Sequence, residues 1–392
     1  MHFGLIIISA MLILAVNMGL RQALGIFLPE MGEIYALSMP SLSFAFAFQN
    51  LLWGAIAPFA GVLAERHGYG KVLFTGSLIY SLGTALLAVS ESAWVYHLSN
   101  GVLLGIGVGA TTFSVVLGAV SKNVSDKHRS VALGIASAGG SLGQFIYAIA
   151  GNMLNQSAGY GNTMLIFAVT VLTIPLLMLP LSKSKPSTLH EKTSGTPFKD
   201  KNFILLTSGF FVCGFHVAFI SVHLPNYAAF CGLSTDVAAT SLAIIGLCNV
   251  FGTIAAGWLG GRFHKPYLLS SVYMARALLI LMFFLSPKSA ANFYWFSVIM
   301  GMLWLSTVPL TSGSVAQLFG AGKVASIFGW VMFGHQVGAF VAVYSAGWIV
   351  EKTGGYDMAW YLSVGLGVIA AVMHLPMNRE VFRQAQKNHV ST

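Results

Sequence analysis

The sequence predicts an all-α integral membrane protein with twelve transmembrane helices in two pseudo-symmetric halves of six. Its 392 residues are 56% hydrophobic and only 8% charged, with a mean hydropathy of +0.78, whereas soluble domains carry about 25% charged residues. Apolar runs of about twenty residues recur along the whole chain, and each is long enough to cross a hydrocarbon core of roughly 30 Å. An internal repeat then divides the predicted helices into two sets.

Twelve apolar runs define the predicted helices. In chain order they lie near residues 4–29, 41–64, 71–90, 94–120, 128–152, 162–181, 202–229, 237–261, 266–286, 291–318, 323–350 and 358–377. The first run differs from a secretory signal peptide, because its apolar core is longer and no Lys or Arg precedes it. We therefore expect it to be retained as the first span.

The basic residues fall on one side of the predicted membrane. If both termini are cytoplasmic, sixteen of the 20 Lys and Arg residues lie in inner segments, whereas Lys288 and Lys352 lie in outer loops. The other two, Arg21 and Arg276, lie within spans. This bias follows the positive-inside rule, so we expect a multi-pass protein of the cell inner membrane with cytoplasmic termini. The same topology explains the net charge of +9, which gives no indication of a nucleic-acid partner.

A polar segment separates two groups of six spans. Ser182–Lys201, "SKSKPSTLHEKTSGTPFKDK", is rich in Ser, Thr, Pro and Lys and is typical of a flexible linker. The predicted organisation is a six-helix half over residues 1–181, a cytoplasmic linker over 182–201, a second six-helix half over 202–378 and a cytoplasmic tail over 379–392.

The two predicted halves also align with each other. At an offset of 196 residues "LPEMGEIYALS" from Leu28 matches "LPNYAAFCGLS" from Leu224, and Gly61 and Gly105 match Gly257 and Gly301. At an offset of 195 "GSLGQF" from Gly140 parallels "HQVGAF" from His335. Four matches in the same order at nearly one spacing favour a duplicated six-helix unit.

One segment of the first half resembles a known motif. "GVLAERHGYGK" contains Gly61, Glu65, Arg66, Gly68 and Lys71. It is similar to the loop between spans two and three of the major facilitator superfamily. The resemblance implies that family's twelve-helix fold and a cytoplasmic gating motif, in which glycines allow close helix approach and charges pair to hold one conformation shut.

The second copy of this motif departs from the pattern. Gly261 stands where an acid is expected, although Arg262 and Lys265 remain. We therefore expect the first copy to carry most of the cytoplasmic gating.

The first two spans resemble a narrower branch of the superfamily. "RQALGIFLPEM" and "SFAFAFQNLLWGAIAPFAGVLAERHG" look like bacterial members of the monocarboxylate and oxalate/formate branch, and Arg21 lies about one position from a lysine of the animal carriers. The resemblance implies a small organic anion as substrate. Those carriers also place an acid and an arginine one turn apart in span eight, where this chain has Asn249 and Thr253. The arginine expected to hold a carboxylate is therefore replaced.

Arg21 is the principal candidate for substrate binding. None of the eleven acidic residues lies clearly within a predicted span, and a cation at membrane depth costs about 3 kcal/mol unless it finds a partner or a polar cavity. An anionic substrate would supply that partner, and the planar guanidinium suits a carboxylate. The alternative is that Arg21 caps backbone carbonyls or extends to the outer surface.

Arg276 is predicted to have a different role. Span nine lies in the outer support ring of the resembled fold, so we favour a structural contact with neighbouring helices over substrate binding.

Two histidines are candidates for proton coupling and substrate contact. His216 falls within one position of the counterpart of Arg21 in the second half, and His335 lies in the middle of span eleven. Histidine is the side chain that gains and loses a proton under physiological gradients. For each residue the alternative is a neutral imidazole bonded to a backbone carbonyl or water, and the substrate could also carry the proton itself.

Amide side chains complete the predicted pocket. Gln49, Gln144 and Asn249 lie mid-span on helices two, five and eight, and we rank them above Asn17, Asn50 and Gln336. Because amides in apolar helices need partners, about half of them are expected to bond neighbouring helices instead.

Other function classes find no support in the sequence. The three cysteines lack metal-ligand spacing, and the chain contains neither enzyme motifs nor a Walker-type phosphate loop. We expect no metal, no cofactor and no enzymatic activity. A receptor or sensor with this fold would be expected to carry a large soluble domain or tail.

The sequence therefore predicts a monomeric secondary transporter that works by alternating access. Its predicted substrate is a small organic anion, a monocarboxylate, moved by proton symport or anion exchange. The alternative is a siderophore or drug transporter of the same fold. A siderophore can also be anionic, whereas proton-driven drug efflux lacks support because no acid lies within a span.

Overall fold

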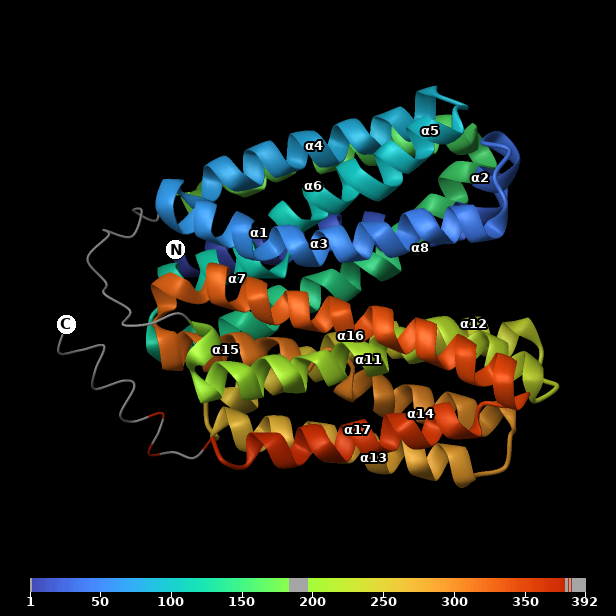
Figure 1. Cartoon of the computed structure of the whole chain (residues 1–392). Coiled ribbons are helices and arrows are strands. Elements are labelled where there is room, and N and C mark those ends of the chain that lie inside the picture. Colours follow the sequence, from blue (N-terminus) through green and yellow to red (C-terminus); the bar gives the residue numbers. More distant parts are fainter. Residues whose placement is uncertain (1, 183–196, 378–379, 381, 383–392) are drawn as a thin grey trace. The chain divides into compact units, whose positions relative to one another are not determined.

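Helices make up the regular structure of the whole described chain. The computed structural model describes residues 2–182, 197–377, 380 and 382, and throughout these residues the regular structure is helical (Figure 1). The predicted all-α architecture is confirmed. Most of the predicted linker and of the predicted tail lies outside the described residues.

Eleven helical segments of the described residues are long and apolar enough to cross a membrane. They cover Phe3–Phe27, Ser41–His67, Tyr69–Val89, Ala93–Asn123, Asp126–Ser182, Lys201–Phe230, Asp236–Gly260, Lys265–Leu285, Ala290–Phe319, Ala321–Thr353 and Asp357–His374. Asp126–Ser182 has 57 residues, and at about 1.5 Å per residue it is nearly three hydrocarbon cores long. Gly159 interrupts it with φ 80° and ψ 167°, a backbone conformation that glycine adopts without strain. Two spans meet at Gly159, so the structure agrees with the twelve predicted spans.

The described residues group into two compact units. Unit 1 is Met1–Ser125, Ile135–Lys192 and Ala321–Phe333, and unit 2 is Asp126–Gly134, Thr193–Gly320 and Gly334–Thr392. Two long helices, α8 (Asp126–Val171) and α16 (Val324–Thr353), contribute residues to both units. The predicted division at residues 182–201 remains a prediction.

Unit 1 contains the helices of the first six spans. These are α1 (His2–Ala23), η1 (Leu24–Phe27), α2 (Leu28–Ile34), α3 (Met39–His67), α4 (Tyr69–Val89), α5 (Ala93–Tyr96), the π-helix η2 (His97–Leu103), α6 (Leu104–Thr111), α7 (Phe113–Asn123), most of α8, α9 (Ile174–Leu177) and α10 (Leu179–Ser182), together with η4 (Ala321–Lys323) and the start of α16.

Unit 2 contains the helices of the last six spans. These are η3 (Pro197–Lys199), α11 (Lys201–Phe230), α12 (Thr235–Gly260), α13 (Lys265–Leu285), α14 (Ala290–Leu303), α15 (Thr307–Phe319), most of α16 and α17 (Asp357–His374), together with the start of α8.

The same helix contact recurs in both units. In unit 1 a Cβ on Gly143 of α8 would collide with the carbonyl oxygen of Ala15 on α1, and in unit 2 a Cβ on Gly338 of α16 would collide with that of Phe211 on α11. The two glycines are 195 residues apart and their partners 196. The sequence repeat is therefore matched by a repeat in packing, in which two backbones touch because neither glycine has a side chain.

The fourth span of each half is broken, although the sequence predicts continuous helices over 94–120 and 291–318. Thr112, between α6 and α7, has φ −99° and ψ −163°, and in unit 2 α14 ends at Leu303 before α15 begins at Thr307. Pro309 explains the second break, because it has no N–H and its ring would clash with the carbonyl of Leu305 in a continuous helix.

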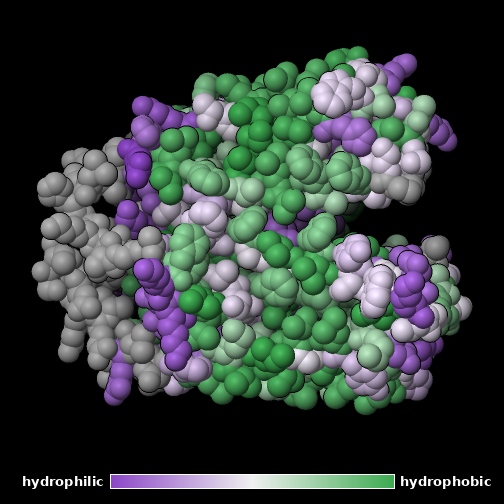
Figure 2. Space-filling view, in the orientation of Figure 1, coloured by the Kyte–Doolittle hydropathy of each residue, from purple (hydrophilic) through white to green (hydrophobic). Residues whose placement is uncertain are grey.

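Large apolar side chains cover the flanks of the helices in each unit. Phe59 is 62% exposed and Leu82 is 54% exposed in unit 1, and Leu285 is 68% exposed in unit 2. Figure 2 shows hydrophobic residues along the sides of the helices and hydrophilic residues near their ends. Such flanks suit lipid, since the helices satisfy their own backbone hydrogen bonds.

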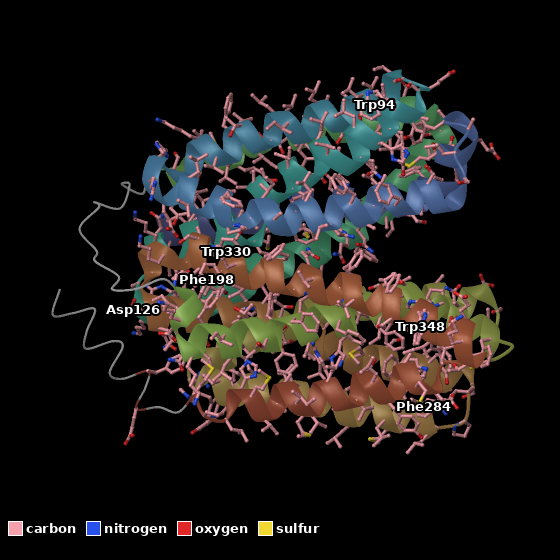
Figure 3. All side chains as sticks on the ribbon, in the orientation of Figure 1. Trp94, Asp126, Phe198, Phe284, Trp330 and Trp348 are labelled. Atoms are coloured by element: carbon pink, nitrogen blue, oxygen red, sulfur yellow. The ribbon has the colours of Figure 1, made fainter. Side chains whose placement is uncertain are left out.

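The two ends of unit 2 can be followed in Figure 3. Asp126 begins α8, and Phe198 lies in η3, just before α11. Both residues are at one end of the unit, whereas Phe284 and Trp348 lie toward the other. Lys265 begins α13 and Phe284 is next to its last residue, so Lys265 belongs to the Asp126 end. Lys127 and Arg129 follow Asp126, and Lys199 and Lys201 follow Phe198, so basic residues gather at that end of the unit.

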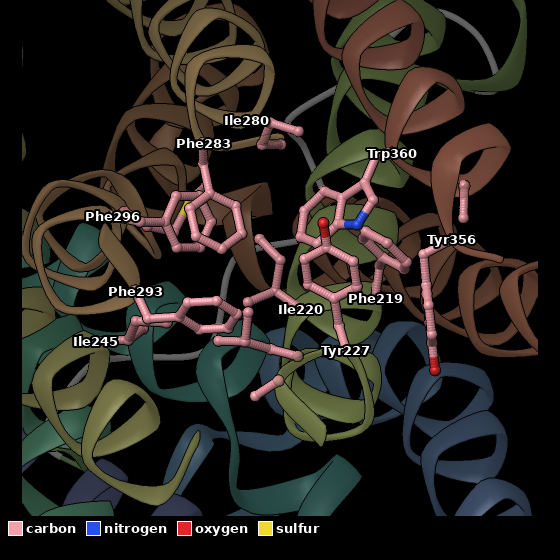
Figure 4. Close-up of a cluster of buried hydrophobic side chains, with 14 of the residues drawn as sticks. Phe219, Ile220, Tyr227, Ile245, Ile280, Phe283, Phe293, Phe296, Tyr356 and Trp360 are labelled. Carbon is pink, nitrogen blue, oxygen red and sulfur yellow. The ribbon is translucent and has the colours of Figure 1, made fainter. Parts of the chain in front are cut away.

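An aromatic core holds the helices of unit 2 together (Figure 4). Phe283 of α13 stacks on Phe296 of α14 with ring centroids 4.2 Å apart, and Phe219 of α11 meets Trp360 of α17 edge to face at 4.8 Å. These side chains are buried, and Tyr227 contacts both Phe283 and Trp360. The core fixes the helices that carry the buried polar residues described below.

Candidate functional site

Arg21 lies in unit 1 among polar and aromatic groups of α3. Its Nη2 donates to Oδ1 of Asn50, and its guanidinium carbon lies 4.9 Å from the ring centroid of Trp53. One helical turn before Arg21, the hydroxyl of Tyr80 on α4 donates to the carbonyl oxygen of Asn17 at 3.0 Å. Arg21 is partly exposed, whereas Trp53 and Tyr80 are buried.

The guanidinium points toward the middle of the membrane span. Trp53 is one residue from the midpoint of the 27-residue span Ser41–His67, whereas Arg21 lies only six residues from the end of Phe3–Phe27. The side chain therefore extends away from the nearer end of its own span. This placement differs from that of an arginine that reaches the surface.

Two hydrogen-bond donors of this site have no protein acceptor. Nε of Arg21 and Nε1 of Trp53 are buried and make no hydrogen bond within the described residues. In the same part of the chain Arg21 makes no ion pair with a carboxylate. Two acids of the same unit are engaged elsewhere, since Glu30 accepts from Asn155 and Glu65 accepts from Ser326. The site thus combines an uncompensated cation with a second free N–H group.

The predicted amides of unit 1 lie in different surroundings. Gln49 is buried, and its Nε2 donates to the carbonyl oxygen and Oδ1 of Asn100 at 3.0 and 3.2 Å. This amide joins α3 to η2 and makes no hydrogen bond to Arg21 in the described part of the chain. Gln144 is half-buried on α8. The structure instead brings Asn50, which sequence analysis ranked lower, into contact with Arg21.

Arg276 is fully occupied by its own unit. From α13 its Nε and Nη2 donate to the carbonyl oxygen of Leu303 at 3.1 and 2.5 Å, and Nη2 also donates to that of Trp304. Its Nη1 lies 3.5 Å from the sulfur of Cys213. The guanidinium therefore caps the end of α14, where the negative end of the helix dipole favours a cation.

Two other predicted residues of unit 2 are also bonded to protein. His216 is buried, and its Nε2 lies 2.8 Å from the carbonyl oxygen of Ser363. Oδ1 of Asn249 accepts from the backbone N–H of Leu305 and from the hydroxyl of Thr253, both at 2.9 Å. These contacts match the structural alternatives considered for histidines and amides in apolar helices.

His335 retains a free ring nitrogen. It is 8% exposed, and its ring lies 5.0 Å from that of Phe210. Its Nδ1 is buried without a hydrogen-bond partner among the described residues. Nδ1 of His216 also has no partner among these residues, so the two histidines differ in their exposure, which is 8% for His335 and 1% for His216.

The predicted gating motif forms a compact contact with α16 inside unit 1. Glu65 is 4% exposed, and Oε1 accepts from the backbone N–H and hydroxyl of Ser326, both at 2.8 Å. A Cβ on Gly61 would collide with the backbone of Ala325. Gly68 ends α3 with φ 100°, and Arg66 and Lys71 are exposed. The carboxylate thus caps the N-terminus of α16, an interaction the sequence analysis assigned to paired charges.

The second copy of the motif is built differently. Gly257 of α12 packs against the backbones of Ser130 and Gly134, and the guanidinium of Arg262 stacks 3.7 Å over the ring of Trp258. Lys265 is buried beside Gly313. The glycine contact is kept while the carboxylate cap is missing, because Gly261 occupies its position.

Trp53, Tyr80, Cys213 and Thr307 are contacts that sequence analysis missed. Each of them lies within a predominantly apolar span, so composition gave no signal. The internal repeat did contain a signal. Asn17 lies 196 residues before Cys213, and Tyr80 lies 196 residues before Arg276.

Comparison with known proteins gives one family. The sequence model described as Major Facilitator Superfamily matches residues 10–343. An uncharacterised MFS-type transporter of Bacillus subtilis (strain 168) is 23% identical over 374 residues, covering 91% of this chain and 90% of that protein. Monocarboxylate transporter 12 of Mus musculus is 26% identical over 419 residues, covering 97% of this chain and 86% of that protein.

Solved structures agree on the fold. The E. coli fucose:proton symporter superposes with a TM-score of 0.75 at 17% identity, covering 96% of this chain and 98% of that one. The human organic anion transporter TETRAN superposes with a TM-score of 0.73 at 17% identity, covering 95% and 99%. At this identity the likeness concerns the fold.

Proposed function

Because the chain belongs to the Major Facilitator Superfamily, whose members carry small substrates across membranes, we propose that it transports a small organic anion, specifically a monocarboxylate. The proposed mechanism is alternating access with proton symport or anion exchange. The proposed setting is the cell inner membrane, with both termini in the cytoplasm, in keeping with the distribution of Lys and Arg.

The observation that supports this function best is the state of Arg21. A buried or half-buried cation within a span is costly without a partner, and Arg21 has no carboxylate partner in the described part of the chain. Asn50 supplies one neutral oxygen and Trp53 supplies the negative face of its ring. Neither contact neutralises the charge, so a bound anion would complete the site.

The free donors suit a carboxylate in particular. Arginine binds carboxylates through two parallel N–H···O bonds, and the unpaired Nε of Arg21 belongs to such a pair of donors. Nε1–H of Trp53 is the second unpaired donor. One cation with two free donors matches a substrate with one carboxylate group.

The relatives support the same class. Several proteins named monocarboxylate transporters align with nearly the whole chain at low identity. Span eight of this chain differs from the pattern of that branch, since Asn249 binds Leu305 and Thr253 within unit 2. We infer that Arg21 takes the main role in holding the carboxylate.

Coupling to protons is assigned to His335. Nδ1 has no hydrogen-bond partner among the described residues in either histidine, but His335 is 8% exposed, whereas His216 is 1% exposed and its Nε2 lies 2.8 Å from a backbone carbonyl oxygen. If the transporter exchanges anions, or if the substrate enters as the neutral acid, no protein proton carrier is needed. The Glu65 contact with Ser326 is the proposed cytoplasmic gate.

Counterflow in proteoliposomes tests the substrate class. Proteoliposomes that contain the purified protein are loaded with unlabelled lactate, pyruvate, oxalate, formate, a dicarboxylate or an iron chelate. Uptake of the same solute in labelled form is then followed. We expect exchange with at least one monocarboxylate and its loss in Arg21→Gln, with partial activity in Arg21→Lys. Lys352→Gln, which removes an exposed outer charge, serves as the control.

Two outcomes would overturn the proposal. One is exchange of a cation or neutral solute with no exchange of any anion. The other is wild-type uptake and affinity in Arg21→Gln. Exchange of the iron chelate alone would instead favour a siderophore carrier of the same fold.

A further inference from the structure

The broken fourth span is held by a buried side chain in each unit. The break lies between α6 and α7 in unit 1 and between α14 and α15 in unit 2 (Figure 1). Carbonyl groups at such a break have lost their intrahelical donors, and lipid offers no replacement. Something in the protein must therefore satisfy them.

In unit 1 the first span reaches the break through a threonine. Nδ2 of Asn17 on α1 donates to Oγ1 of Thr111 at 2.5 Å and lies 3.5 Å from the carbonyl oxygen of Val108, and the Thr111 hydroxyl donates to the carbonyl oxygen of Gly107 at 2.7 Å. Tyr80 holds the Asn17 backbone through its hydroxyl. Asn17 and Tyr80 are both fully buried.

In unit 2 the third helix of the half supplies the hydrogen-bond donor at the break. Arg276 of α13 donates to the carbonyl oxygens of Leu303 and Trp304, and its Nη1 lies 3.5 Å from the sulfur of Cys213. That sulfur lies 3.1 Å from Oγ1 of Thr307. Arg276 is 1% exposed, so its contacts are within the protein.

The two arrangements occupy equivalent positions of the repeat. Each member of the unit 2 cluster lies 196 residues after its unit 1 counterpart, giving the pairs Asn17 and Cys213, Tyr80 and Arg276, Val108 and Trp304, and Thr111 and Thr307. The threonine is kept in both copies. Where unit 1 has an amide donor on the first helix, unit 2 has a thiol, which donates weakly. Where unit 1 has a phenol on the third helix, unit 2 has a guanidinium.

We propose that Asn17 and Arg276 are positioning residues that hold the broken spans four and ten, and that Arg276 replaces the amide that Cys213 lacks. Arg276 therefore acts on α14 and α15 and does not bind the transported solute. This inference rests on the fold and is independent of the substrate class. It also accounts for a buried cation without a carboxylate partner, since helix-end carbonyls compensate it.

The repeat supplies a direct test by transplanting one arrangement into the other. The variants are Arg276→Gln, Arg276→Tyr, Cys213→Asn and the double variant Cys213→Asn with Arg276→Tyr, all as full chains in nanodiscs. Hydrogen–deuterium exchange is followed by mass spectrometry over residues 300–312, together with the thermal unfolding midpoint. Ser271→Ala, an exposed hydroxyl on the same helix α13, is the control.

The expected result is a rescue. Exchange over residues 300–312 should rise about tenfold or more in Arg276→Gln and Arg276→Tyr, and the double variant should return it to within about threefold of wild type, because one hydrogen-bond donor has been restored. If Arg276→Gln does not fold, the comparison of Arg276→Tyr with the double variant still tests the proposal. Equal exchange in those two would overturn the proposal, as would wild-type exchange in Arg276→Gln.

A second arm separates positioning from solute binding. With any solute that the wild type accepts in counterflow, the double variant should keep its KM, since it lacks the cation but keeps the break. If the double variant regained wild-type hydrogen–deuterium exchange but no longer bound that solute, Arg276 would be assigned to solute binding. That result would overturn the positioning role. Failure of the carboxylate panel leaves the exchange measurement intact, so the two proposals fail independently.

Discussion

Arg21 lies over the indole of Trp53, with the guanidinium carbon 4.9 Å from the ring centroid, and each side chain keeps one buried N–H group without an acceptor. The cation comes from α1 and the indole from α3, so the pair joins two helices of unit 1 at mid-span. A ring face stabilises a guanidinium and leaves the edge of the fork free. This geometry supports a site that is organised before the proposed anion binds.

Trp53→Phe should weaken anion binding while keeping the ring. The change removes Nε1–H, and a hydrogen bond to a charged group contributes about 1.5–3 kcal/mol, so KM should rise about tenfold or more. Trp53→Leu also removes the cation–π contact, worth about 0.5–2 kcal/mol, and should raise KM further. The concentration dependence of counterflow measures both, with the exposed Trp94→Phe as control. An unchanged KM in Trp53→Phe would remove the indole from the site.

Asn50→Asp should inactivate the site by supplying an internal counter-ion. Asn50 already accepts a hydrogen bond from Arg21 through Oδ1, so an aspartate there would pair with the guanidinium and compete with the solute. We expect KM for the carboxylate to rise at least tenfold, and Asn162→Asp on an exposed surface of α8 to have no effect. Tight anion binding in Asn50→Asp would show that the solute does not need the Arg21 charge.

The number of spans could be predicted from the sequence, but the rotation of each helix about its own axis could not. Runs of about twenty apolar residues determine where a chain crosses lipid, and the observed spans agree with those runs. The same runs place apolar residues on every face of a helix, so periodicity cannot tell which side carries a contact. Arg21 was recognisable from its charge alone, whereas its partners Asn50 and Trp53 depend on how α3 is rotated.

The polar residues that bond within unit 2 were ambiguous in the sequence for a related reason. His216 and Asn249 are polar groups at mid-span, as a binding residue would be, and their partners Ser363 and Leu305 lie 147 and 56 residues away in sequence. Spacing within one helix gives no information on such contacts. The break after α14 could have been anticipated from Pro309. Arg276, which binds the carbonyl oxygens at this break, occupies the position equivalent to Tyr80 in the sequence repeat.

His335→Gln should flatten the pH dependence of uptake if protons are coupled through the protein. His335 is 8% exposed, whereas His216 is 1% exposed and its Nε2 is hydrogen-bonded to the carbonyl oxygen of Ser363. His216→Gln should therefore keep the shape of the pH profile while lowering the unfolding midpoint. Initial rates of uptake measured between about pH 5 and pH 8, where histidine ordinarily titrates, provide the comparison. The same profile in His335→Gln as in wild type would point to a proton carried by the solute or to anion exchange.

Glu65 and Ser326 should be energetically coupled. The carboxylate accepts from both the backbone N–H and the hydroxyl of Ser326, so Glu65→Gln and Ser326→Ala each remove part of one network. Double-mutant cycles in such networks give about 0.5–3 kcal/mol, and we expect a coupling within that range from reversible unfolding in detergent. Arg66→Gln, an exposed neighbour in the motif, should show no coupling to Ser326→Ala. Additive effects of Glu65→Gln and Ser326→Ala would mean that the cap does not stabilise α16.

Gly143→Ala and Gly338→Ala should destabilise the protein to a similar degree, because they test the same contact in the two units. A methyl group at either position would meet a backbone carbonyl oxygen, of Ala15 or of Phe211, and overpacking of this kind costs about 1–3 kcal/mol. Gly365 on α17 is the matched control, since a Cβ there would meet no atom within 4 Å. Gly365→Ala should be neutral or stabilising, because alanine loses less backbone entropy on folding. Thermal unfolding of the three variants in detergent measures the effect. A large loss in only one of Gly143→Ala and Gly338→Ala would show that the repeated contact does not stabilise the two units equally.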